Sequence, residues 1–194
     1  YDHTFFRELP NLYGYILTCN NMVTPWNSDV LPKELLIDNC VDHYISTGTG
    51  LNWIYNLKSL NYHENTKVTF TDINPVVLDF MQALVTKWDG KDYASFYMSH
   101  LKRVPQNYKH YDLDSHKIKI EEWFEEFKTI HCDFKEVWDS VKKLKFNYVL
   151  IDYYAENEYD FIDSNDTTFI NISNIFNYVP FAPFSTVKYR VSRE

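Results

Sequence analysis

The chain has 194 residues, of which 45% are hydrophobic, and it carries a formal net charge of −8. This length and composition predict one globular domain and exclude an intrinsically disordered chain. The acidic balance disfavours a nucleic acid as partner, because its phosphates would be repelled. A small or neutral acceptor fits the charge better.

Neither a membrane span nor a disulfide framework is predicted. No apolar run approaches the roughly 18 residues that a transmembrane helix needs. Cys19, Cys40 and Cys132 are odd in number and far apart, which indicates neither paired disulfides nor a metal site. No signal peptide is visible. We therefore expect a cytoplasmic protein, and the sequence leaves its oligomeric state open.

Residues 1–40 show no regular hydrophobic period, and we predict that they form an N-terminal cap segment over the core. A regular domain is expected to follow at residues 41–194. It opens with a strand at residues 41–46, a turn at 47–50 and a helix at 51–60. Residues 67–73 are β-branched and aromatic, which favours a second strand.

Further helices and strands are expected to alternate along the rest of the domain. Asn74 and Pro75 suit the N-cap and first position of a helix that runs to about Trp88. The remaining expected helices cover residues 91–103, 118–127 and 134–144, with a last one from Ser185 that the chain end cuts off. The remaining expected strands are a weak one at residues 128–132 and two buried ones at 146–151 and 167–172.

This alternation predicts an α/β fold, a Rossmann-like three-layer sandwich with a mostly parallel central sheet flanked by helices. In such sheets ligands bind at the carboxyl ends of the strands, where the strand order reverses. The candidate site therefore lies in the turns that follow the strands. These turns are Ser46–Gly50, Asp72–Asn74, Cys132–Phe134 and Asp152–Tyr154.

Gly48 and Gly50 allow a tight turn and a close approach of the backbone to a ligand. The helix that follows offers free N–H groups to a carboxylate or a phosphate. Two glycines alone are also compatible with an ordinary strand-to-helix turn. Trp53 stands where a dinucleotide fingerprint has its third glycine, which argues against an NAD-dependent oxidoreductase.

Acidic residues end the next expected strands. Asp72 lies about 20 positions after Gly50 and can accept both hydroxyls of a ribose, or else cap the next helix. Asp133 can accept the exocyclic amine of an adenine, or else cap its own helix. Asp152 stands beside two tyrosines whose rings can face a positive sulfur. A structural turn is the alternative there.

The motifs together resemble those of class I S-adenosylmethionine-dependent methyltransferases over about residues 41–175. The run Tyr44 to Gly50 resembles the first motif, and Val68 to Pro75 resembles the second. His131 to Phe134 is similar to the adenine-contacting turn, and Phe146 to Tyr154 to the fourth strand and its loop. That loop lacks the Pro-Pro-Tyr form of enzymes that methylate nucleic-acid bases.

The resemblance implies S-adenosylmethionine as cofactor and a role for each matching position. Gly48 and Gly50, with Ser46, would pass the methionine part. Asp72, with Ile73, would hold the ribose, and Asp133, with Cys132, would read the adenine. Asp152 would lie near the methionine end of the cofactor or near the acceptor. Beyond the resemblance, we expect Asp152 and Tyr154 to act in catalysis and Tyr153 to contact the acceptor. The polar cluster after the last strand suggests that Ser173 or Asn174 also contacts the acceptor.

Other interpretations remain open. A methyltransferase-like fold can bind a cofactor or partner without turnover, and the same cofactor can donate its aminocarboxypropyl group. A general base could assist an oxygen acceptor. Five histidines are candidates for this base by residue type alone, and we expect them at the surface. They are His43, His63, His100, His110 and His116.

Overall fold

The computed structural model describes residues 40–47, 50–72, 74–100, 113–151, 161–163 and 165–171. The cap segment before Cys40 and the helix expected from Ser185 lie outside these residues. The described elements are β1 (Val41–Thr47), α3 (Asn52–Ser59), β2 (Tyr62–Asp72), α4 (Pro75–Lys87), α5 (Tyr93–His100), α6 (Leu113–Ile130), α7 (Phe134–Val141), β3 (Lys145–Leu150) and β4 (Thr168–Asn171).

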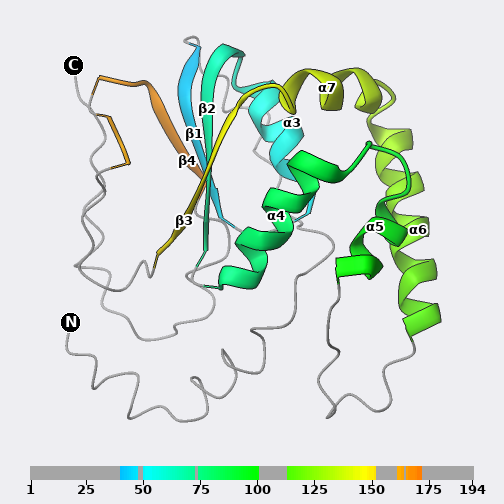
Figure 1. Cartoon of the computed structure of the whole chain (residues 1–194). Coiled ribbons are helices and arrows are strands. Elements are labelled where there is room, and N and C mark those ends of the chain that lie inside the picture. The colour runs from blue at the N-terminus through cyan, green and yellow to red at the C-terminus, as the bar shows by residue number, and fades with distance from the viewer. Residues whose placement is uncertain are drawn as a thin grey trace, which may run out of the picture.

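The four strands form one sheet in the order β3-β2-β1-β4, and all three pairings are parallel. The chain steps from β1 to β2 to β3 in one direction and then returns to place β4 on the other side of β1 (Figure 1). This confirms the expected α/β fold, a parallel sheet flanked by helices as in a Rossmann-like sandwich. The order 3-2-1-4 is that of a doubly wound sheet.

All five described helices lie on one side of the sheet (Figure 1). Right-handed crossovers explain this arrangement, because the steps from β1 to β2 and from β2 to β3 run in the same direction. The side chains that face these helices are large and apolar, among them Tyr44, Phe70 and Phe146. The strand residues between them, such as Thr69 and Thr71, face the opposite side of the sheet and are buried as well.

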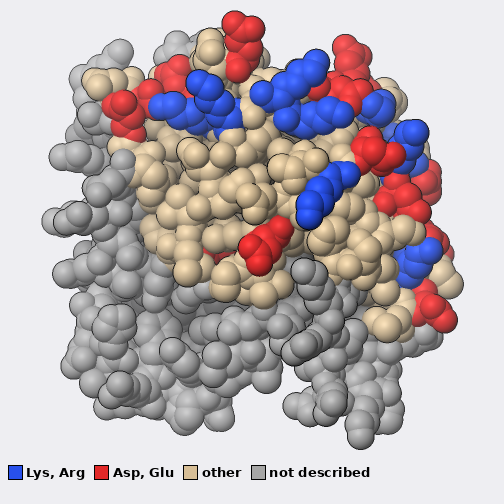
Figure 2. All heavy atoms as spheres, in the orientation of Figure 1, with Lys and Arg blue, Asp and Glu red and all other residues tan. Residues whose placement is uncertain are grey.

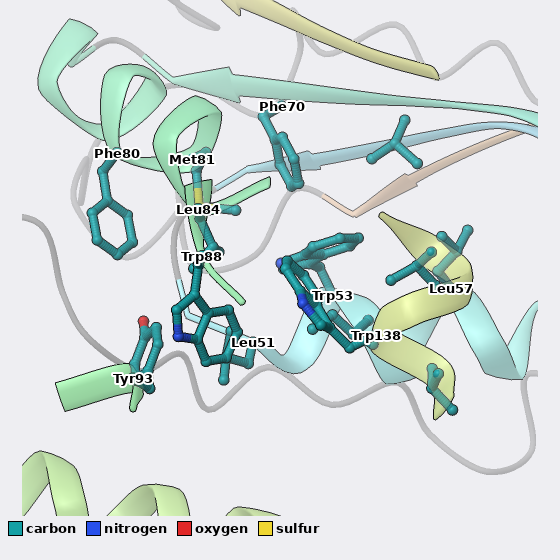
Figure 3. Close-up of a cluster of buried hydrophobic side chains, with 14 of the residues drawn as sticks. Leu51, Trp53, Leu57, Phe70, Phe80, Met81, Leu84, Trp88, Tyr93 and Trp138 are labelled. Atoms are coloured by element: carbon teal, nitrogen blue, oxygen red, sulfur yellow. The ribbon is translucent and has the colours of Figure 1, made fainter. Parts of the chain in front are cut away.

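Three tryptophans from three different parts of the chain pack the helices against one another and against the sheet (Figure 3). Trp138 of α7 lies between Trp53 of α3 and Trp88 at the end of α4, with ring centroids 6.4 Å and 5.0 Å away. Trp53 also meets the ring of Phe70 in β2 edge-on at 5.1 Å. Aromatic contacts between helices, as well as contacts with the sheet, therefore hold the core together.

β2 is longer than the sequence pattern predicts. It begins at Tyr62, and the register with β1 shifts between Val41 and His43. Thr66 holds this irregular part in place, since its buried hydroxyl donates to the carbonyl oxygen of Val41 at 2.7 Å. A single bulge of this kind lets a polar stretch extend a strand without an alternating pattern.

The expected strand at residues 128–132 is wrong. Residues up to Ile130 belong to α6, whose buried face of Ile120, Phe124 and Phe127 has helical spacing. The helix continues through Thr129, whose hydroxyl donates to the carbonyl oxygen of Glu125 one turn earlier. The strand at Lys145–Leu150 is consequently the third strand and not the fourth, and it pairs with β2.

Candidate functional site

The strand order reverses between β1 and β4, so the carboxyl ends of these two strands mark the position where α/β sheets bind ligands. Ser46 of β1 is in register with Asn171, the last residue of β4. The Thr47 hydroxyl donates to the carbonyl oxygen of Asn171 at 3.4 Å. The Asn171 amide donates to the Tyr44 hydroxyl at 3.5 Å, which directs this side chain back along β1.

β1 ends at Thr47, and α3 begins soon after it in sequence, at Asn52. Ser46 is buried, and its hydroxyl donates to the carbonyl oxygen of Thr47 at 3.4 Å. Gly50 has φ of 83°, a left-handed conformation that side chains disfavour. Leu51 occupies the N-cap of α3 and makes no side-chain capping bond. The start of α3 therefore offers a partial positive charge to an anionic group. Gly48 lies outside the described residues.

The end of β2 carries Asp72 in the position that the sequence predicts. Its Oδ1 accepts the N–H of Asn74 at 2.8 Å, and Asn74 caps α4 by accepting the N–H of Val76 at 3.0 Å. Pro75 takes the first helical position, as expected. Asp72 is half-buried. One of its carboxylate oxygens binds the Asn74 N–H, and the residue remains partly exposed to solvent. Ile73 lies outside the described residues.

β3 ends beside Asp72. The N–H of Ile151 donates to the carbonyl oxygen of Asp72 at 3.0 Å. The turn after β3 thus starts at the carboxyl edge and next to β2, on the side of the sheet away from β4. The predicted site residues of the next two turns lie outside the described residues. These are Asp152, Tyr153, Tyr154, Ser173 and Asn174.

Cys132 and Asp133 are not at the carboxyl edge. They form the turn between α6 and α7, and α7 leads directly into the start of β3 at the opposite edge (Figure 1). Asp133 accepts the Tyr55 hydroxyl at 3.2 Å and forms an ion pair with Lys58, both in the later turns of α3. The adenine-reading role of this turn was predicted from a strand that is absent, and the structure removes its basis.

The contacts of Asp133 are those of a structural ion pair. The Lys58 ammonium lowers the pKa of the Asp133 carboxyl. Burial, and then the charge of Asp133, raise the pKa of Tyr55. The Tyr55 ring also stacks on His131, with the ring centroids 3.5 Å apart. This cluster ties α3 to the turn before α7, and Asp133 stands at the N-cap of α7 without capping it through its side chain.

His43 is a feature that the sequence did not predict. It lies in the middle of β1 and is only 1% exposed, so the expected surface position is wrong for this histidine. Its Nε2 is 2.7 Å from the Thr69 hydroxyl, and its Nδ1 has no hydrogen-bond partner among the described residues. Burial, aided by the positive charge of Lys67, lowers the pKa of His43. Burial therefore favours the neutral form of the ring.

His43 should make the folded state less stable in acid. Above the unfolded-state pKa of a histidine, about 6.5, the ring is neutral in both states and does not affect the free energy of unfolding. Below that pH the unfolded state binds a proton more readily than the folded state, because the folded pKa is lowered, and the free energy of unfolding falls. We expect the free energy of unfolding to fall between pH 7 and pH 5, and we expect His43 to contribute up to about 1.4 kcal/mol per pH unit to this slope. Urea denaturation of wild type and His43→Gln across this range measures that share. Equal pH slopes in the two proteins would contradict the assignment.

Comparison of the chain with protein-family models, with curated proteins and with solved structures finds no match. The assignment of function therefore depends on the geometry of the sheet and its carboxyl edge. Among the described residues, no helix is long and apolar enough to cross a membrane.

Proposed function

We propose that this chain is an S-adenosylmethionine-dependent transferase, and specifically a methyltransferase that acts on a small acceptor other than a nucleic acid. The observation that carries the proposal is the position of Asp72 at the carboxyl end of β2, next to the glycine turn that follows β1. A nucleoside needs an acceptor for its ribose hydroxyls at this place, beside a backbone that it can approach closely.

The residues at this edge fit the cofactor in chemistry. The Asp72 carboxylate has the acceptor chemistry that ribose hydroxyls need, and the positive φ of Gly50 allows close approach of the chain to the methionine part. The α3 N-terminus, without a side-chain cap at Leu51, suits the methionine carboxylate. The bound cofactor would supply an activated methyl group, and the chain would contribute binding, orientation and exclusion of water.

The position of β3 changes the roles proposed for two turns. Asp152 follows Ile151 directly, and β3 pairs with β2, so we assign Asp152 to the nucleoside side of the site. We assign the acceptor side to Ser173 and Asn174, which follow β4 in sequence, because β4 ends at Asn171 beside β1. Tyr153 and Tyr154 remain candidates for contact with the reacting groups.

The charge of the chain and its thiols complete the proposal. A net charge of −8 favours a small or neutral acceptor over a polyanion. Cys40 and Cys132 are free and exposed, a state that is common in reducing compartments, and we place the protein in the cytoplasm.

Calorimetric titration with S-adenosylmethionine and S-adenosylhomocysteine tests the cofactor site. We expect wild type to bind with micromolar affinity and Asp72→Ala to bind about 100-fold more weakly or worse, because two hydrogen bonds to a charged group at about 1.5–3 kcal/mol each are lost. Asp72→Asn keeps an acceptor for the Asn74 N–H and separates loss of charge from loss of the turn. Asp133→Ala is the matched control, and it should bind like wild type.

Three outcomes distinguish the alternatives. Absence of binding to wild type would overturn the cofactor assignment. Weakened binding in Asp133→Ala with unchanged binding in Asp72→Ala would move the nucleoside to the other edge of the sheet. If the cofactor binds, the by-product of turnover decides the reaction, since methyl transfer leaves S-adenosylhomocysteine and aminocarboxypropyl transfer leaves methylthioadenosine.

A further inference from the structure

β3 is the edge strand of the described sheet, and its outer edge has no strand partner among the described residues. Exposed edges of this kind pair with other strands unless charges, prolines or bulges blunt them. β3 has a continuous register with β2, contains no proline and has a single charge, Lys145, at its first position. Leu150 at its far end is 61% exposed. Within the part of the chain that the structure describes, nothing therefore blunts this edge against pairing with another strand.

The surface around this edge is poor in charge. Figure 2 views the molecule from the side on which β3 and α4 lie in front, and among the described residues charged side chains gather along the top and right of this face and are sparse over its centre. α4 contains only two charged residues, Asp79 and Lys87, and both are exposed. Few charges therefore stand near the edge of β3 to oppose its pairing with another strand.

We propose that this face binds a second copy of the chain, with the two β3 strands paired antiparallel about a two-fold axis so that one continuous sheet crosses the interface. The axis must stand perpendicular to the sheet, because antiparallel neighbours in one sheet keep their faces on the same sides. Both helical layers then lie on one side of the joined sheet, and the two α4 helices become antiparallel neighbours.

The spacing of the elements suits this arrangement. α4 lies against both β2 and β3. Strands in a sheet are about 4.8 Å apart, so the two α4 axes would be separated by about two strand spacings, about 10 Å. Packed helices lie about 8–10 Å apart. The joined sheet therefore brings the helices to contact distance without displacing either from its own strands.

The charges on α4 are self-complementary in this arrangement. Asp79 lies in the first half of the helix and Lys87 at its end, and neither forms an ion pair with another described residue. In an antiparallel pair of helices, Asp79 of one copy faces the Lys87 end of the other. Two-fold symmetry makes this contact twice. The uncharged side chains Gln82 and Thr86 lie exposed between them.

Sedimentation equilibrium of wild type and of charge variants tests the dimer independently of any cofactor. We expect a monomer–dimer equilibrium in the micromolar range, between about 1 and 100 µM. Asp79→Lys and Lys87→Asp should each weaken dimerisation by about tenfold or more, because each creates two like-charge contacts. The double variant Asp79→Lys/Lys87→Asp should recover an affinity close to that of wild type. Circular dichroism checks that each variant keeps its fold.

Hydrogen exchange tests the strand pairing itself. Amides of residues 145–150 should be better protected at concentrations where wild type is dimeric than in Asp79→Lys at the same concentration. A wild-type protein that stays monomeric over the whole range would overturn the proposal. So would a dimer that is indifferent to both charge reversals, or one in which β3 gains no protection, since either result would place the interface elsewhere.

Discussion

Replacing Trp138 by alanine is expected to lower the free energy of unfolding by about 3–5 kcal/mol, the range for large aromatic side chains removed from a core. Trp138 is completely buried. Its ring centroid lies 6.4 Å from that of Trp53 and 5.0 Å from that of Trp88. Loss of the ring therefore opens a cavity where α3, α4 and α7 meet (Figure 3). Urea denaturation followed by circular dichroism measures the change.

The matched variant is Trp138→Phe. The indole N–H of Trp138 has no hydrogen-bond partner among the described residues, so its removal leaves nothing unpaired. Phenylalanine keeps a ring between the two other tryptophans, and we expect a loss below about 1.5 kcal/mol, as for conservative core replacements. A Trp138→Ala protein that loses less than about 1 kcal/mol would show that the three helices do not depend on this contact.

The sequence predicted the first two strands and the start of α4, although not the full length of β2, because its signals there are local. The β-branched and aromatic run at residues 67–73 and the Asn74-Pro75 start of a helix can each be recognised from local stereochemistry. The structure confirms a strand that ends at Asp72 and a helix that begins at Pro75. The glycine turn after β1 is predicted for the same reason, and Gly50 does adopt a left-handed conformation. Residues that cap, turn or alternate can be interpreted without knowing their distant neighbours.

The second half shows where local signals fail. Residues 128–132 contain a β-branched pair, Thr129 and Ile130, that resembles a short strand, but the helical face of α6 extends through them. That single error moved Asp133 to the wrong edge of the sheet and made β3 the fourth strand. Sheet order is a property of long-range pairing, and only the register of β4 with β1 shows that Asn171 lies at the point of reversal. Likewise, the burial of His43 depends on what faces β1 and not on its own neighbours in sequence.

A substitution at Gly90 is expected to lower the free energy of unfolding by a similarly large amount, because Gly90 lies against the ring of Trp138. Gly90 has φ of 85°, and a Cβ at this position would lie 2.5 Å from Trp138 Cδ1 and 2.9 Å from its Nε1. Gly90→Ala therefore combines left-handed strain of about 1–2 kcal/mol with overpacking of about 1–3 kcal/mol against a completely buried ring. We expect the free energy of unfolding to fall by about 2–5 kcal/mol in total.

A double-mutant cycle separates the two terms. In a Trp138→Leu background the overpacking should disappear, so that Gly90→Ala costs only the strain of about 1–2 kcal/mol, and the coupling between the two sites should equal the difference, about 1–3 kcal/mol. Urea denaturation of the four proteins gives all the values needed. A cost of Gly90→Ala that is the same in both backgrounds would mean that the ring yields to the methyl group. The turn that ends α4 would then be fixed by backbone conformation alone, and the close contact with Trp138 would have no part in holding α7 against it.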